Sequence, residues 1–298
     1  MRWATNGQKR HCILWSILLT GHVAISHCVK DFPESPFESD AAVLLADLDG
    51  ANDFFIARSP DTVSNLAIWY KADSITLSDG DPVLTWTDDS GSGNDAVSGT
   101  VGMQPVFKEN QINDLPAVQL DGIDDEMVST DVAFDSHTVF FVARFTKPFP
   151  GSDFRMNVIS KHHNVPNHST ALYFNWRNDG SSFATFRNSV DGATEFFAGR
   201  SVNPDQWYIV AGTFNGIISS IFIDGELADA SDSNAGVIND TSFPFYIGRN
   251  ANTLAHRFEG EIAEIIMFRE HISDQHRVEI ECYLGLKYAL PLPHNCTY

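Results

Sequence analysis

Short apolar runs separated by turn residues fill the chain from residue 65 to residue 268. The clearest runs are rich in β-branched and aromatic side chains, which favour strands; they are residues 138–145, 207–214, 217–223, 245–248 and 262–268. Many short strands without long helical patterns between them are typical of a β-sandwich or barrel. The pattern therefore predicts an all-β fold.

Pairs that end in glycine stand between these runs and mark the turns: Asp79-Gly80, Asp121-Gly122, Asp191-Gly192, Asn215-Gly216 and Asp224-Gly225. Such pairs supply the positive φ angles that tight hairpins need. Asn215-Gly216 joins two strand-like runs directly, and Asp224-Gly225 closes the next turn. We therefore expect antiparallel neighbours in this part of the chain.

One segment after the strands has helical periodicity. Val278, Cys282 and Leu286 recur four residues apart, and Ser273 precedes them as a suitable N-cap. Two prolines, Pro291 and Pro293, follow the pattern and would end it. We expect a short C-terminal helix packed against the sandwich.

The N-terminus reads as a targeting segment. Basic residues precede an apolar run over residues 12–26 that ends among small side chains, as in a cleaved secretory signal peptide. The run is shorter than the about 20 residues of a spanning helix, although an uncleaved signal anchor stays an alternative. We divide the chain into a signal peptide (1–26), an acidic leader (27–64), the β-domain (65–290) and a tail (291–298), which predicts a secreted or cell-surface protein.

Cysteines and sequons fit that compartment. Cys12 leaves with the signal, and a Cys282–Cys296 bridge would stabilise the C-terminus by about 3 kcal/mol. Cys28 is an alternative partner for either residue, so the pairing stays open. Three sequons are candidate glycosylation sites: Asn167, Asn239 and Asn295.

Charge excludes some partners. Lys and Arg number 19 against 39 Asp and Glu, which leaves a formal charge of −20. Nucleic-acid binding and adsorption to anionic membranes both depend on excess Lys and Arg, so neither is expected. We also expect no membrane insertion once the signal is cleaved.

Two acidic loops are candidate calcium sites. The first contains Asp88, Asp89 and Asn94, and the second contains Asp121, Asp124 and Asp125. Carboxylate and amide oxygens are the ligands that Ca²⁺ prefers. Neither loop has the EF-hand spacing, and the same residues are common in ordinary turns. Calcium binding and pure turn formation therefore stay open for both loops.

Tryptophans separate into two groups. Trp69, Trp86 and Trp207 stand among apolar strand residues, where indoles most simply fill the core between sheets. Trp176 differs because Asn175 and Arg177 flank it beside a turn. These three residues form a candidate sugar-binding group, although strand alternation alone would also permit Trp176 to point inward.

Several stretches in this order resemble laminin-G-like domains of the concanavalin A-like lectin/glucanase superfamily: residues 66–73 (LAIWYKAD), 86–96 (WTDDSGSGNDA), 116–125 (PAVQLDGIDD), 207–214 and 260–290. The resemblance covers residues 65–290. It implies a jelly roll of two curved antiparallel sheets, an extracellular setting, and a binding or adhesion role. Some relatives carry calcium, and others are enzymes.

The enzymes of this superfamily place three carboxylates at i, i+2 and i+4 of one strand, where side chains share a face. Glu259 and Glu261 satisfy the first two positions, but Ala263 occupies the third. Strict alternation puts Glu264 on the other face, as a structural carboxylate held by backbone N–H groups or by an arginine such as Arg249. The catalytic triad is therefore missing.

These observations predict a secreted, non-enzymatic binding or adhesion protein. Its partner would be a glycan or a glycosylated extracellular protein, with Ca²⁺ as a candidate cofactor. A polysaccharide-degrading enzyme of the same fold and a structural domain of a surface coat are the alternatives.

Overall fold

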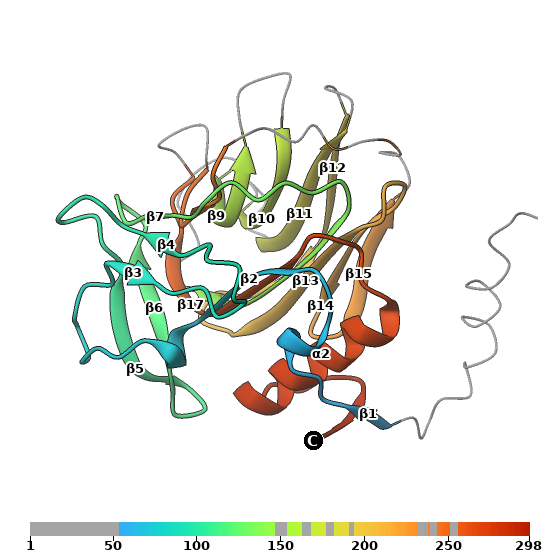
Figure 1. Cartoon of the computed structure of the whole chain (residues 1–298), viewed down its shortest axis with the longest axis horizontal. Helices are drawn as coiled ribbons and strands as arrows, with labels where there is room; N and C mark the ends of the chain where they lie inside the picture. The colour runs from blue at the N-terminus through green and yellow to red at the C-terminus, as the bar shows by residue number, and fades with distance from the viewer. Residues whose placement is uncertain are drawn as a thin grey trace, which may run out of the picture. The chain divides into compact units, whose positions relative to one another are not determined.

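Strands dominate the computed structural model of the chain (Figure 1). The structure describes residues 54–146, 154–162, 168–176, 182–190, 194–231, 236, 238, 243–250 and 256–298. The expected signal peptide and most of the expected leader lie outside these residues. Among the described residues, no helix has the length and apolar character needed to cross a bilayer.

Two sheets form the body of the fold. Sheet I has the order β15 (Glu226–Ser231), β14 (Ser219–Ile223), β13 (Tyr208–Phe214), β8 (His137–Phe145), β17 (Glu259–Phe268), β6 (Leu115–Asp121), β5 (Val106–Ile112), with β2 (Leu66–Lys71) also paired to β17. Sheet II has the order β12 (Thr194–Ser201), β11 (Ser182–Val190), β10 (His168–Trp176), β9 (Phe154–His162), β16 (Tyr246–Ile247), β7 (Met127–Val128), β4 (Ala96–Val97), β3 (Thr85–Trp86).

Neighbouring strands in both sheets run antiparallel. The hairpin expected at Asn215-Gly216 joins β13 to β14, and the one at Asp224-Gly225 joins β14 to β15. Asp224 and Gly225 have φ angles of 49° and 79°, as a tight hairpin needs. The prediction of an all-β jelly roll with a short C-terminal helix is confirmed.

Aromatic and aliphatic side chains fill the space between the two sheets. Trp86, Phe141 and Phe186 are fully or almost fully buried there. Gly212 on β13 lies against the ring of Phe186 on β11, where a Cβ would come within 2.6 Å of a ring carbon. Only glycine permits this close approach, so the two sheets are packed tightly at this point.

A second apolar layer lies on the other face of sheet I, under helix α2 (Asp274–Tyr288). Ser273 caps the helix through a 3.2 Å hydrogen bond from the His276 N–H, and Ala289 ends it with a left-handed φ of 52°. The helix packs Ile280, Leu284 and Tyr288 onto this face of the sheet. The helix prediction is confirmed.

The same layer corrects one expectation about the tryptophans. Trp86 lies between the sheets as predicted, but Trp69 belongs to the layer under α2, and Trp207 packs against that layer. All three contribute to packing. Alternation along a strand predicts two faces, and the sequence does not show that both faces of sheet I are covered.

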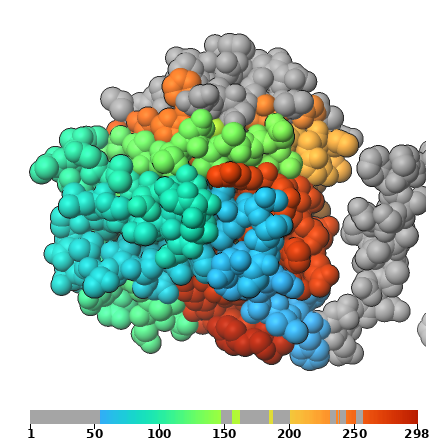
Figure 2. Space-filling model, in the orientation of Figure 1, coloured from blue at the N-terminus to red at the C-terminus, as the bar shows by residue number. Residues whose placement is uncertain are grey.

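The two ends of the described chain meet beside α2. Strand β1 (Phe54–Ile56) runs parallel to β18 (Asn295–Thr297), and Figure 2 shows blue and red segments side by side at this corner. A disulfide joins Cys282 on the helix to Cys296 on β18, which is the bridge that the sequence offered. Arg58 also forms an ion pair with Glu279 of the helix.

These strands lie in segments that we assigned to the leader and the tail. The compact unit spans Asp53–Tyr298, which is longer than the expected domain of residues 65–290. Each strand has only three residues and pairs with the opposite end of the domain. Such a pairing leaves no periodic signal in the sequence.

Candidate functional site

The first acidic loop, residues 88–95, is held by internal hydrogen bonds. One Asp88 oxygen accepts the N–H groups of Trp69 (2.9 Å) and Ser90 (3.0 Å). The other accepts the Ser90 hydroxyl (2.7 Å) and the Asn94 N–H (2.9 Å). Asn94 donates its amide to the Ala67 carbonyl (2.7 Å), and Asp89 pairs with Lys71 at 3.5 Å. Asp88 is also buried, so this carboxylate ties the loop to β2.

The second acidic loop brings its carboxylates together. Ligand oxygens of Asp121, Asp124 and Asp125 all lie within 4.8 Å of one another, just after β6. One Asp121 oxygen accepts the N–H groups of Ile123 (2.8 Å) and Asp124 (3.2 Å). Asp125 accepts the Asp121 N–H at 2.9 Å. This donor set consists of hard oxygens, which suit Ca²⁺.

The electrostatics of this loop also favour a cation. The pKa of Asp125 is raised to about 6, mainly by burial and in smaller part by the charges of Asp121 and Asp124. Three carboxylates this close repel one another in their ionised form. A bound cation would remove that repulsion.

Two buried arginines hold the second loop in place. Arg249 and Arg257 both bond Glu126, at 2.7 and 2.8 Å. Arg257 also donates to the backbone carbonyls of Asp124 (3.1 Å) and Asp125 (3.3 Å). These two carbonyls are therefore engaged, and the side-chain carboxylates of the loop are the candidate ligands.

Glu264 was expected to be held by backbone N–H groups or by an arginine such as Arg249, and the structure gives its carboxylate other partners. Arg249 bonds Glu126 instead, and Glu264 is fully buried under α2. Its carboxylate accepts hydrogen bonds from Trp69 Nε1 (2.5 Å), Tyr288 (2.7 Å) and Lys287 (2.8 Å). Glu264 is structural, as expected, but its partners come from the helix and β2.

The face assigned to Glu264 is also corrected. A β-bulge between Ile262 and Glu264 interrupts the pairing of β17 with β8. Ile262 and Ile265 belong to the core between the sheets, whereas Ala263 and Glu264 both face the layer under α2. The bulge inserts one residue and changes the alternation, which the sequence pattern does not reveal. With Glu264 engaged by four side chains, no catalytic group of three carboxylates forms on this strand.

The sugar-binding candidates lie at one end of sheet II. Asn175 and Trp176 are the last two residues of β10, where Trp176 pairs with Phe154 of β9 and Ser182 of β11. The structure describes only their backbone, and Arg177 lies outside the described residues. Among the sequons, Asn167 and Asn239 also lie outside them, whereas Asn295 is exposed on β18.

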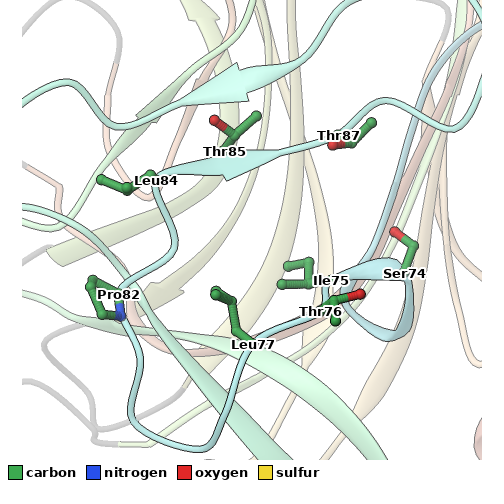
Figure 3. A pocket seen from close by; sticks show the side chains of 8 residues that line it. All are labelled: Ser74, Ile75, Thr76, Leu77, Pro82, Leu84, Thr85 and Thr87. Carbon is green, nitrogen blue, oxygen red and sulfur yellow. The ribbon is translucent and has the colours of Figure 1, made fainter.

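A groove of about 250 Å³ lies beside the edge strand β3, between residues 74–77 and residues 82–87 (Figure 3). Hydroxyl and aliphatic side chains line it in equal number: Ser74, Thr76, Thr85, Thr87, Ile75, Leu77, Pro82 and Leu84. Charged and aromatic side chains are missing from this lining. The sequence did not single out this groove, because its walls carry no motif.

Two facing antiparallel sheets around an aromatic core define the chain as a jelly-roll β-sandwich. The chain belongs to the concanavalin A-like lectin/glucanase superfamily, since the laminin G profile of that superfamily matches residues 121–276, just over half of the chain. Among curated proteins, no sequence matches the chain.

Solved structures share the fold at low identity. The binding domain of Paraclostridial Mosquitocidal Protein 1 is 13% identical with a TM-score of 0.55, covering 77% of this chain and 53% of that one. The receptor-binding domain of botulinum neurotoxin D is 13% identical with a TM-score of 0.53, covering 76% and 54%. This chain therefore spans about half the length of the two toxin domains.

A third structure matches over almost its entire length. It is domain 4 of AbnA, a GH43 extracellular arabinanase from Geobacillus stearothermophilus, in complex with arabinotriose. The identity is 13% and the TM-score 0.51, with 73% of this chain and 98% of that domain covered. At these identities the likeness establishes the fold.

Proposed function

We propose that this protein is an extracellular glycan-binding or adhesion module without enzymatic activity. The observation that carries the proposal is the fold itself, because the arabinanase domain of the same fold was solved with a bound oligosaccharide. The two toxin domains are named as binding and receptor-binding domains. The partner of this chain would be a glycan or a glycosylated extracellular protein.

The state of the carboxylates supports binding over hydrolysis. A glycoside hydrolase needs an acid and a second carboxylate that both face the substrate. Glu264 is sealed under α2, and Glu261 forms an ion pair with Arg144. Neither group is placed for that chemistry in the described part of the chain.

Secretion is part of the proposal. A disulfide between Cys282 and Cys296 fits an oxidising compartment, and the exposed sequon at Asn295 is accessible for glycosylation. N-terminal sequencing of protein collected from the culture medium should find the residues up to about Ser26 removed. An intact Met1 on that material would contradict cleavage.

We assign sugar contact to Asn175, Trp176 and Arg177, and calcium binding to the second acidic loop. An indole beside amide and guanidinium groups suits a sugar ring, which has an apolar face and a hydroxyl rim. Calcium at Asp121, Asp124 and Asp125 would fix the loop between β6 and β7. Bound calcium would thus hold this loop in one conformation while the protein binds its glycan.

A glycan array separates the proposed function from its alternatives. The intact secreted protein should bind a subset of glycans and release no reducing ends from them. Trp176→Ala should weaken binding at least tenfold, whereas Ile217→Ala, at an exposed apolar residue of the β13–β14 turn, should leave it unchanged. Release of reducing ends would establish the enzyme instead, and neither binding nor turnover would favour the surface-coat domain.

A further inference from the structure

The groove beside β3 has free hydrogen-bonding capacity on both walls. Thr76, Thr85 and Thr87 are exposed, and within the described part of the chain their hydroxyls bond no protein group. The Ser74 hydroxyl donates to the Lys71 carbonyl at 2.9 Å and keeps its capacity to accept. A hydroxyl both donates and accepts, so this lining matches a ligand that is itself rich in hydroxyl groups.

The apolar half of the lining is exposed and aliphatic. Leu84 is 58% exposed and Leu77 is 38% exposed, and Figure 3 shows them on opposite sides of the groove. Flat sugar faces generally stack on aromatic rings, which this lining does not offer. Branched aliphatic side chains instead suit a compact apolar substituent such as a methyl group.

The acidic residues that border the groove are already engaged. Asp73, next to Ser74, pairs with Lys287 at 2.8 Å. Asp81, next to Pro82, accepts the Ser78 N–H at 2.9 Å. Asp88, next to Thr87, is filled by the four hydrogen bonds described above. The lining itself carries no charged side chain to pair with an ionised ligand, and the net charge of −20 disfavours an anion, so the groove favours an uncharged ligand.

We propose that this groove is a subsite for a neutral saccharide unit that carries a methyl group, as in a 6-deoxy sugar. The hydroxyls of Thr76, Thr85 and Thr87 bond the sugar hydroxyls, and Leu77 and Leu84 contact the methyl group. The inference rests on the proposed function and names the ligand class for one surface of the molecule. A volume of about 250 Å³ suits one sugar ring rather than a long chain.

An added peptide strand fits the groove less well. Strand β3 is an edge strand, which is where a peptide would pair. It has only two residues, Thr85 and Trp86, so the ladder it offers is very short. The hydroxyl-rich lining adds no pocket for a large side chain.

The test compares two sugars that differ in one methyl group. The secreted full-length protein is titrated with the methyl glycosides of L-fucose and of L-galactose, which carries a hydroxymethyl group in place of the methyl group. Burial of the methyl group should make the fucoside bind about threefold to fivefold more tightly. Equal affinity for the two sugars would contradict the proposal that the groove prefers a sugar with a methyl group.

Matched variants locate the site. Leu84→Asp should weaken fucoside binding at least tenfold, and Thr85→Val should weaken it about threefold to tenfold through one lost hydrogen bond. Leu227→Asp is the control, because Leu227 is 59% exposed on β15, in the other sheet. Unchanged melting temperatures of all three variants establish that the fold is intact.

The outcomes distinguish this inference from the proposed function. If Leu84→Asp binds glycans as tightly as the parent protein, the groove is not the site, although glycan binding stands. If the parent protein binds no glycan at all, both ideas fail together. Loss in Leu84→Asp of binding to uncharged extended peptides, without any effect on sugars, would assign the groove to peptides and overturn the inference.

Discussion

The two acidic loops are both rich in aspartate and glycine, but their carboxylates are arranged differently in the structure. In the loop of residues 88–95, Asp88 is buried and both of its oxygens are filled by protein donors. In the loop of residues 121–126, Asp121, Asp124 and Asp125 converge within 4.8 Å. In the first loop hydrogen bonds from protein groups stabilise one buried carboxylate, whereas in the second loop three carboxylates lie close together.

This difference shows that acidic composition alone does not define a cation site. What matters is whether several carboxylates converge on one point or a single carboxylate is filled by N–H and O–H donors. In the second loop N–H groups also bond Asp121 and Asp125, but the three carboxylates still converge, and Arg257 bonds backbone carbonyls of this loop. Our calcium proposal is therefore restricted to the second loop, and for the first loop we propose turn formation alone.

The largest expected effect comes from Asp88→Ala. This change leaves buried N–H groups of Trp69 and Asn94 without acceptors, which should lower the free energy of unfolding by about 3 kcal/mol. Asp124→Ala removes one of three carboxylates that repel one another. This variant should change the free energy of unfolding by less than about 0.5 kcal/mol. Urea denaturation of both variants without calcium measures this difference in the free energy of unfolding. Equal losses in the two variants would contradict the distinction between the two loops.

Calcium should act on the second loop alone. At a concentration ten times the dissociation constant, binding to the native state should raise the melting temperature by about 3–6 °C. Asp124→Asn should abolish the shift, and Asp89→Asn in the first loop should preserve it. A melting temperature that ignores both calcium and chelator would refute the calcium site.

The last effect concerns pH. The raised pKa of Asp125, about 6 in the folded state, means that the native protein binds this proton more tightly than the unfolded chain does. Without calcium, this group's contribution to stability is complete below its unfolded pKa and is lost as the pH rises through about 6. With calcium, the ion competes with the proton, so the calcium shift should fade as the pH falls through about 6.

Asp125→Asn is the variant that isolates this titration. It should flatten the pH dependence of the melting temperature between about pH 4 and pH 7 in calcium-free buffer. A slope that is unchanged in this variant would show that other groups carry the pH dependence.

Features with a local physical signal were predictable from the sequence. The N-cap at Ser273, the prolines after the helix and the Asn215-Gly216 hairpin each act within a few residues of their signal. The bridge between Cys282 and Cys296 closes a short loop, and it is present in the structure. The order of the stretches that resemble laminin-G-like domains correctly predicted the jelly-roll fold.

Features that depend on distant partners were not predictable. Arg249 bonds Glu126 across more than a hundred residues, and no spacing rule connects the two. The β-bulge at Ala263 reversed the expected face of Glu264 because one extra residue shifts the alternation of the rest of the strand. The groove beside β3 depends on two chain segments that meet only after folding.

The pairing of β1 with β18 has a mechanical consequence. A pull on the chain ahead of Phe54 would have to break the pairing of β1 with β18 before it detached β1 from this corner of the domain. The sulfur–sulfur bond would keep β18 joined to Cys282 of the helix that lies on sheet I, so β1 would separate from a partner strand that stays in place. In a copy of this domain attached through its N-terminal segment, the strand that pairs with β1 would thus be fixed to the helix by a covalent bond.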